Sequence, residues 1–337
     1  MPTVLITGAN GEIGHGLITR LAETANTRIV ALDLNTPDET IRKKCYRSIN
    51  GDITDAAVVE NLGANHDFDV IIHLAALLST KSERMPKLAH FVNVDGTLNL
   101  LELAVSEARQ QGKPIRFIYP SSIAVYGFPS VAAKTQAGKV KEDHWCEPRT
   151  MYGINKLYCE KLGNYYQKYY RQLDAQESKG LVDFRGIRFP GLISAHTLPT
   201  GGTSDFAPEM IHAAAAGKPY ACFVRPDARI PFMAMPDGID ALLRLMDAPL
   251  EALKRTVYNA SAFSPSAGEL AGLTRKAFPG ARITFEPDLK RQGIVDSWPA
   301  DVDDSAARAE WGFEPAYDLE RTFHEYLLPN VRRRYAR

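Results

Sequence analysis

The stretch TGANGEIGHGL, residues 7–17, follows a short apolar run and begins a segment of helical period. Its glycines have GxxGxxG spacing, one residue longer in the first interval than the GxGxxG fingerprint of dinucleotide-binding loops. Glycine permits a tight turn from strand to helix and lets the backbone approach a pyrophosphate, whose charge is met by N–H groups at the helix start. A glycine triplet alone is also compatible with a plain turn. The predicted cofactor loop comprises Gly8, Asn10, Gly11, Ile13 and Gly14.

An acidic residue supports the cofactor interpretation of this loop. Asp33 ends the second apolar run, about 20 residues after the glycines, where an acid can accept both ribose hydroxyls of adenosine. No arginine follows it in LDLNTPDE (32–39), so a 2′-phosphate would be repelled, and NAD is predicted rather than NADP. The next acid-bearing loop, NGDITD (50–55), places Asp52 and Ile53 where they can contact adenine; its alternative is a surface turn with a capping Asp.

Short apolar runs alternate with segments of helical period in the first half of the chain. Amphipathic helices are predicted at 13–25 and 93–109. Nearly continuous apolar runs are typical of strands covered by helices on both faces. The predicted strands are VLITG (4–8), RIVALDL (28–34), DVIIHLAA (69–76), IRFIYPSS (115–122) and FRGIRFPG (184–191). This alternation predicts an α/β fold with a Rossmann-like, doubly wound parallel sheet.

The pattern changes after about residue 190, where loop residues become frequent and strands such as RTVYNAS (255–261) are short and isolated. We therefore expect an NAD-binding domain at 1–190 and a smaller C-terminal substrate-binding lobe at 191–337. A helix at 235–249 is a candidate to return to the first domain. The segment LDAQESKG (173–180) is expected to be a flexible surface insertion.

Composition excludes several classes of protein. The 337 residues are 45% hydrophobic, and 40 basic residues balance 40 acidic ones, so no overall field favours nucleic acid or a membrane surface. No apolar run is long enough to span a bilayer, and the N-terminus lacks a signal core, so a cytoplasmic location is expected. The basic run at 332–334 is interpreted as a solvated helix end.

Metal chemistry is not expected. Cys45, Cys146, Cys159 and Cys222 form no CxxC pair, and the eight histidines show no HExxH spacing. His73 lies inside an apolar run and is interpreted as a hydrogen-bonded core histidine rather than a ligand.

A second signature carries acid–base chemistry. In YGINK, Tyr152 and Lys156 stand four residues apart and share one face of a helix. A tyrosine with a pKa of ~10 is a poor base at neutral pH, but a nearby ammonium stabilises its phenolate. In PSSIAVYG (120–127), Ser122 ends the fourth predicted strand and can hydrogen-bond a substrate oxygen. Together these residues predict a catalytic Ser, Tyr and Lys.

These motifs resemble those of the extended short-chain dehydrogenase/reductase superfamily, and HLAALLS (73–79), NVDGT (93–97) and RFPG (188–191) add to the likeness. Within it, nearly the whole chain resembles the short-chain type of L-threonine 3-dehydrogenase. The stretches specific to that type are GGTSDFA (201–207), CFVRPDARIPFMAMPD (222–237) and DSWPADVDDSAARAEWGF (296–313).

The resemblance implies NAD-dependent oxidation of the L-threonine 3-hydroxyl to 2-amino-3-ketobutyrate. It also implies a homodimer that pairs the helices after NVDGT and at YGINK. The further cofactor contacts that it implies are Leu74, Ala75, Ala76, Asn93 and Pro190. The substrate contacts that it implies, beside Ser122 and Tyr152, are Ser79, Gly202, Thr203, Ser204, Asp205 and Trp298.

The chain departs from the family pattern at two positions, and two other functions are compatible with the motifs. The family usually has threonine and tyrosine where this chain has Ser204 and Phe206, which puts substrate preference in question. One rival is a nucleotide-sugar epimerase or dehydratase with the same Ser, Tyr and Lys, and another is a regulatory NAD-binding protein without turnover. Asp205 opposes a diphosphate and suits an ammonium. Arg225 and Arg229 are interpreted as ion-pair partners rather than phosphate ligands.

Overall fold

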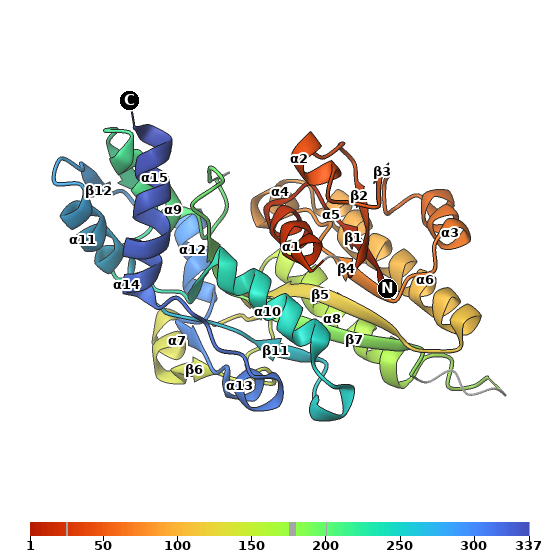
Figure 1. Ribbon diagram of the computed structural model, residues 1–337. Coiled ribbons are helices and arrows are strands. Elements are labelled where there is room, and N and C mark those ends of the chain that lie inside the picture. Colours follow the sequence, from red (N-terminus) through yellow and green to blue (C-terminus); the bar gives the residue numbers. More distant parts are fainter. Residues whose placement is uncertain (25, 175–179, 200, 337) are drawn as a thin grey trace. The chain divides into compact units, whose positions relative to one another are not determined.

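The computed structural model describes residues 1–24, 26–174, 180–199 and 201–336 (Figure 1). The chain divides into two compact units, and neither is continuous in sequence. The first unit comprises 1–121, 154–187 and 242–258, and the second comprises 122–153, 188–241 and 259–337. Residues 175–179 of the expected insertion lie outside the described residues.

A seven-stranded sheet forms the centre of the first unit (Figure 1). Its strand order is β11-β7-β5-β4-β1-β2-β3, and the pairs from β3 through β5 are parallel. The strands are β1 (Thr3–Thr7), β2 (Arg28–Asp33), β3 (Arg47–Asn50), β4 (Val70–His73), β5 (Ile115–Ser122), β7 (Val182–Phe189) and β11 (Val257–Asn259). The predicted doubly wound α/β fold is therefore confirmed.

Two strands of the sheet differ from the prediction. β3 has the sequence RSIN and partly exposed side chains, so no apolar run marks it. β11 was expected as an isolated strand of the second lobe, and that expectation was wrong. All three of its residues are buried, and the sheet continues to its edge through β7, where Gly186 N donates to Thr256 O at 2.7 Å.

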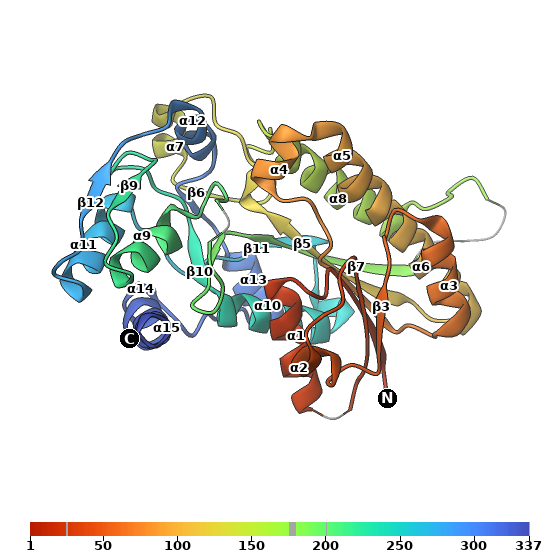
Figure 2. The same cartoon turned by 90° about the horizontal axis from the view of Figure 1, so that it is seen from above.

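Helices cover both faces of the sheet. Figure 2 shows α3, α5, α6 and α8 along one side and α1 and α2 along the other. A π-helical turn, η1, leads directly into α6. The elements of this unit are α1 (Glu12–Glu23), α2 (Glu39–Arg42), α3 (Ala56–Asn65), α4 (Ser79–Arg84), α5 (Pro86–His90), η1 (Phe91–Asp95), α6 (Gly96–Gln111), α8 (Met151–Lys168) and η3 (Leu250–Ala252). The first three residues of α8 cluster with the second unit.

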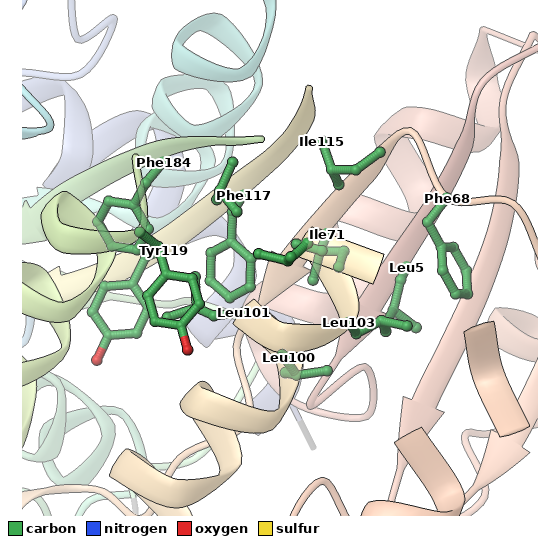
Figure 3. Packing of buried hydrophobic residues seen from close by; sticks show 14 of the residues in the cluster. Leu5, Phe68, Ile71, Leu100, Leu101, Leu103, Ile115, Phe117, Tyr119 and Phe184 are labelled. Carbon is green, nitrogen blue, oxygen red and sulfur yellow. The ribbon is translucent and has the colours of Figure 1, made fainter. Parts of the chain in front are cut away.

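The core of the first unit lies between the sheet and α6 (Figure 3). Leu100 and Leu101 of α6 are fully buried, and so is Ile71 of β4. Phe117 of β5 stacks on Phe184 of β7 with ring centroids 5.8 Å apart. Each such aromatic or aliphatic side chain contributes about 1.5–3 kcal/mol by leaving water, so this layer fixes the strands whose ends carry the site.

The second unit is built from short parallel strand pairs, β10–β8, β12–β9 and β13–β6, with helices around them. α10 (Met235–Asp247) is shared, because 235–241 cluster with the second unit and 242–247 with the first. The other elements are η2 (Ile123–Val125), α7 (Val131–Ala137), β6 (Lys139–Val140), β8 (Gly191–Ile193), α9 (Phe206–Ala215), β9 (Tyr220–Cys222), β10 (Phe232–Ala234), α11 (Ala267–Ala277), β12 (Ile283–Phe285), α12 (Leu289–Ser297), β13 (Asp301–Val302), α13 (Ser305–Trp311), α14 (Leu319–Arg321), η4 (Thr322–Leu327) and α15 (Leu328–Tyr335).

Candidate active site

The glycine loop joins β1 to α1, and backbone atoms occupy the space where side chains would lie. Gly8 has φ +66°, and a Cβ there would lie 2.6 Å from Ala75 N. At Gly14 a Cβ would lie 2.4 Å from the carbonyl oxygen of Ala9. Larger residues would therefore force the loop away from β4 or α1 away from the loop. The result is a cradle of bare backbone at a helix N-terminus, which suits the pyrophosphate of a dinucleotide.

Asp33 lies beside this loop at the end of β2. Its Oδ2 accepts a hydrogen bond from Asn10 N at 2.9 Å, and its Oδ1 accepts one from Asn35 N at 3.0 Å. The carboxylate is therefore fixed next to the glycine loop. A carboxylate has about four acceptor positions, so two backbone donors leave capacity for ribose hydroxyls. Ile13, in the first turn of α1, is half-buried.

The residues that follow β4 also contact the glycine loop. Leu74 N donates to Thr7 O at 3.1 Å, and Ala75 N donates to Thr7 Oγ1 at 3.4 Å. Leu74, Ala75 and Ala76 are all half-buried. Asn93, in the π-helical turn η1, holds Leu77, the residue after Ala76. Its Oδ1 accepts from Leu77 N at 2.7 Å and its Nδ2 donates to Leu77 O at 3.1 Å. Asn93 thus shapes the segment along the cradle.

Asp52 and Ile53, which are predicted to contact adenine, lie at a turn. Asp52 Oδ1 accepts from both Thr54 N and Thr54 Oγ1, at 2.9 and 2.8 Å, so its carboxylate does cap a turn. Ile53 is 5% exposed and belongs to the core. A Cβ on Gly96 would lie 2.5 Å from Ile53 Cδ1, so the isoleucine packs against the start of α6.

Ser122 and Tyr152 meet in the second unit. Ser122 ends β5, and its Oγ accepts from Ala124 N at 3.1 Å as the cap of η2. Tyr152, in the first turn of α8, is hydrogen-bonded to the Ser122 side chain. Burial raises the pKa of the Tyr152 phenol, and this hydrogen bond opposes the rise. Ser122, one of the two predicted partners of Tyr152, therefore favours the phenolate form of the tyrosine.

Lys156 lies one helical turn after Tyr152 on α8 and is 4% exposed. Its Nζ donates to Pro120 O of β5 at 2.6 Å. Burial lowers the pKa of Lys156 to about 8, while the nearby Cys159 and Glu160 act in the opposite direction. An ammonium of this kind is still largely charged at neutral pH, yet it changes charge within the pH range in which a dehydrogenase is assayed.

His73, at the end of β4, is a core residue as predicted. Its Nδ1 lies 2.8 Å from Thr7 Oγ1 and its Nε2 lies 3.0 Å from Thr97 Oγ1. Burial, followed by the charge of Lys156, lowers the pKa of His73 to about 3, so the ring is neutral.

The predicted substrate loop precedes α9. Gly201 has φ +84°, and Gly202 N donates to Asp205 Oδ2 at 2.7 Å, which closes the loop on itself. Arg291 of α12 holds the same loop, because its guanidinium donates to Gly202 O at 2.9 Å. Thr203 is buried at 4% exposure, whereas Ser204 and Asp205 are partly exposed.

The remaining predicted residues are placed as follows. Trp298 ends α12 and is 5% exposed, and among the described residues its Nε1 has no hydrogen-bond partner. Pro190 is buried between β7 and β8. Ser79 begins α4 and is half-buried. The buried indole N–H of Trp298, which has no partner among the described residues, is therefore a donor open to a bound molecule.

Arg225 and Arg229, the two arginines that could have bound a phosphate, instead pair with acidic side chains, as predicted. Arg225 forms two hydrogen bonds with Asp296, at 2.9 and 3.0 Å, and Arg229 donates to Glu269 at 2.8 Å. In the part of the chain that the structure describes, no group of three or more His, Cys, Asp or Glu residues could hold a metal ion. No helix among the described residues is long and apolar enough to cross a membrane.

Two residues of this region were missed by sequence reasoning. Ser121 Oγ donates to Glu160 Oε1 at 2.5 Å, and both side chains are 3% exposed. Glu160 lies four residues after Lys156, as Lys156 lies four after Tyr152. That spacing was a signal for one shared helix face, although a helical glutamate is ordinarily solvated.

The chain is similar to known proteins over most of its length. Residues 4–261 match the model of the NAD dependent epimerase/dehydratase family. The mitochondrial L-threonine 3-dehydrogenase of Bos taurus is 36% identical over 320 residues, which are 94% of this chain and 79% of that protein. A monomeric L-threonine 3-dehydrogenase from a metagenome, in its apo form, superposes with a TM-score of 0.86 at 36% identity, over 98% of this chain and 99% of that one.

A GalE-like L-threonine dehydrogenase from Cupriavidus necator, in its holo form, gives a TM-score of 0.85 at 36% identity, over 98% of this chain and all of the other. The family match covers the glycine loop, Asp33, Ser122, Tyr152 and Lys156. The chain therefore belongs to the NAD dependent epimerase/dehydratase family and is an NAD-dependent dehydrogenase.

Proposed function

We propose that this enzyme oxidises the 3-hydroxyl of L-threonine to give 2-amino-3-ketobutyrate. The observation that carries the chemistry is the hydrogen bond between Ser122 and Tyr152, with Lys156 one helical turn along α8. The substrate is supported by the names of relatives that align over 94–98% of the chain and by the small, acid-bearing loop at 201–205.

Tyr152 is the general base in this proposal. Because burial raises the pKa of Tyr152, the phenolate needs support, which Ser122 supplies as a hydrogen-bond donor. We assign further support to the cation of Lys156, which lies one helical turn along α8. The proton of the threonine hydroxyl goes to the Tyr152 oxygen, and Ser122 holds the substrate oxygen. NAD, when bound, supplies the acceptor for the hydride that leaves C3.

The bare backbone around Gly8 and Gly14 fits the pyrophosphate of NAD, and Asp33 would accept the ribose hydroxyls. Lys156 would hold the nicotinamide ribose. The other residues proposed to line the cofactor are Asn10, Gly11, Ile13, Asp52, Ile53, Leu74, Ala75, Ala76, Asn93 and Pro190.

The substrate contacts are assigned to the loop at 201–205, with Ser79 and Trp298. Asp205 carries a charge that suits an ammonium group, and its contact with Gly202 N fixes its carboxylate in the loop. The same acid opposes a diphosphate, and Arg225 and Arg229 are already engaged with acids. A small amino acid therefore fits the charges of this region better than a nucleotide sugar.

The test is a comparison of substrates with purified protein and NAD. L-threonine should produce NADH absorbance at pH 8, UDP-glucose should produce neither NADH nor its epimer, and D-threonine should react slowly because its amine would miss its partner. Epimerisation of UDP-glucose without NADH from L-threonine would replace this proposal with the nucleotide-sugar function, and activity with none of these compounds would favour the regulatory one.

We also propose a homodimer formed through α6 and α8. Two of the tyrosines of α8 are packing residues, since Tyr166 and Tyr170 are buried and their hydroxyls donate to Glu102 of α6. Two other tyrosines of α8 remain accessible: Tyr158 is 52% exposed and Tyr165 is 39% exposed. Light scattering at micromolar protein should give twice the chain mass; a monomer, as in the name of the metagenome relative, would exclude this interface.

A further inference from the structure

Three consecutive residues at the end of β5 are each bound by α8. Pro120 O accepts from Lys156 Nζ at 2.6 Å, Ser121 Oγ donates to Glu160 at 2.5 Å, and the Ser122 side chain is hydrogen-bonded to Tyr152. The three helix residues are spaced four apart, so three successive turns of α8 together hold the last three residues of the strand, although in a different order. Tyr152 and Lys156 have roles in the proposed reaction, but Glu160 has none.

The burial of Glu160 requires an explanation. Its side chain is 3% exposed, and a carboxylate removed from water is costly unless it is hydrogen-bonded and paired with a positive charge. Ser121 supplies a hydrogen bond. Lys156, one turn earlier on the same face and 4% exposed, supplies the charge. Burial lowers the pKa of Lys156, and the neighbouring Cys159 and Glu160 both oppose that effect and favour the ammonium.

Three further titratable neighbours of Lys156 among the described residues carry no negative charge at neutral pH. His73 of β4 is neutral because burial lowers its pKa to about 3. On α8, burial raises the pKa of both the Cys159 thiol and the Tyr152 phenol. From β5, the ring of Tyr119 lies with its centroid 4.5 Å from Lys156 Nζ.

We propose that Glu160 is a positioning residue: its carboxylate keeps Lys156 charged, and through Ser121 it holds the end of β5 that presents Ser122. The inference rests on the proposed role of Lys156 and Tyr152 in the reaction. Glu160 touches neither substrate nor cofactor in this account. It acts by keeping the charge of Lys156 in place over a wider pH range than a buried lysine would otherwise have.

The test compares E160Q, E160D and S121A with the parent enzyme. E107Q is the matched control, because Glu107 is also buried, at 1% exposure, but lies on α6 and accepts from Phe68 N and Gln111. NADH binding is titrated by fluorescence from pH 6 to 10, which needs no substrate. The affinity should fall as Lys156 loses its proton, since the neutral amine has one donor fewer and no charge.

The midpoint of that fall should move down by about one pH unit in E160Q, since an opposite charge at close range shifts a pKa by one unit or more. The midpoint of E160D, which keeps the carboxylate on a side chain one methylene shorter, should lie between those of the parent and E160Q. E160D decides the test if E160Q does not fold, as judged by circular dichroism. S121A and E107Q should keep the parent midpoint. An E160Q or E160D midpoint equal to that of the parent, or an equal shift in E107Q, would overturn the proposal.

A second readout separates this inference from the proposed function. With L-threonine, E160Q should lose kcat more at pH 9 than at pH 7, whereas the KM should change little. S121A should lower kcat by a similar factor at both pH values, because it loosens Ser122 and leaves the charge in place. Absence of L-threonine turnover in the parent would refute the substrate assignment, and the NADH titration would still decide the role of Glu160.

Discussion

The two loops proposed to hold ligands are both rich in glycine, but they use it differently. In the loop at 8–14, side chains are excluded by nearby backbone, as the 2.6 Å separation of a Gly8 Cβ from Ala75 N shows. In the loop at 201–205, a Cβ on Gly201 would meet nothing within 4 Å, so that glycine is required only for its φ of +84°. Side chains, Asp205 and Arg291, close this second loop.

This difference indicates which of the two loops can change its ligand preference more easily. A cradle made by backbone against backbone has one shape, and it suits a cofactor whose pyrophosphate is always the same. A loop held by two side chains can change its shape and charge through single substitutions. Substrate preference is therefore expected to be more easily altered than the binding of the cofactor pyrophosphate. The Ser204 departure lies in the alterable loop, whereas Phe206 begins α9 and is fully buried.

The largest effect is expected at the chemical step, which belongs to neither loop. Tyr152→Phe removes the proton acceptor and should lower kcat about a thousandfold, while the Kd for NAD changes little. Tyr158→Phe is the control, because Tyr158 lies on the same helix and is 52% exposed. Steady-state rates and NAD titration measure both quantities. A Tyr152→Phe enzyme within a few fold of the parent would remove Tyr152 from the mechanism.

Substitution in the backbone cradle should come next. Gly8→Ala combines a strained φ with contact at Ala75 and should cost about 3 kcal/mol of unfolding free energy, together with most NAD affinity. Gly112 has almost the same φ, +67°, but open space around it, so Gly112→Ala isolates the strain and should leave NAD binding intact. Urea denaturation and calorimetric titration give the two values. Equal effects at both glycines would contradict the close-packed cradle.

Cofactor choice should depend on one side chain of the same region. Asp33→Ser removes the charge that repels a 2′-phosphate and should reduce the NAD over NADP preference in kcat/KM about a hundredfold. The Asn10 N contact is weakened at the same time, so some loss of NAD efficiency is expected. A parent enzyme that uses NAD and NADP equally well would show that Asp33 does not select the cofactor.

The smallest effects are expected in the side-chain loop. Asp205→Asn retains an acceptor for Gly202 N but loses the charge, and it should raise the KM for L-threonine about tenfold without changing that for NAD. Asp227→Asn, at an acid that is 69% exposed and paired with Arg225, is the control. If Asp205→Asn matches the parent while Asp205→Ala does not, Asp205 only closes the loop and the ammonium is bound elsewhere.

The sheet was predictable where an apolar run marks a buried strand, as in β1, β4 and β5. β3 has no such run, and a strand as short as β11 carries no local sign of the sheet that it joins. Helices could be located by their period, but the division of α10 between two units depends on tertiary contacts.

The catalytic prediction rested on spacing, and the structure shows the Ser122–Tyr152 hydrogen bond. Glu160 was missed because the sequence shows its helix position but not that its carboxylate is buried. The contact of Asp205 with Gly202 N was missed for a similar reason, since a local hydrogen bond within a loop leaves no pattern.

The most direct measurement follows deuterium from L-threonine that is labelled at C3. Purified enzyme is mixed with NAD and the labelled substrate, and the NADH formed is analysed by mass spectrometry. The account predicts NADH that carries the deuterium, a slower rate than with unlabelled L-threonine when hydride transfer limits the reaction, and 2-amino-3-ketobutyrate as the product. NADH without deuterium, or no NADH at all, would contradict it.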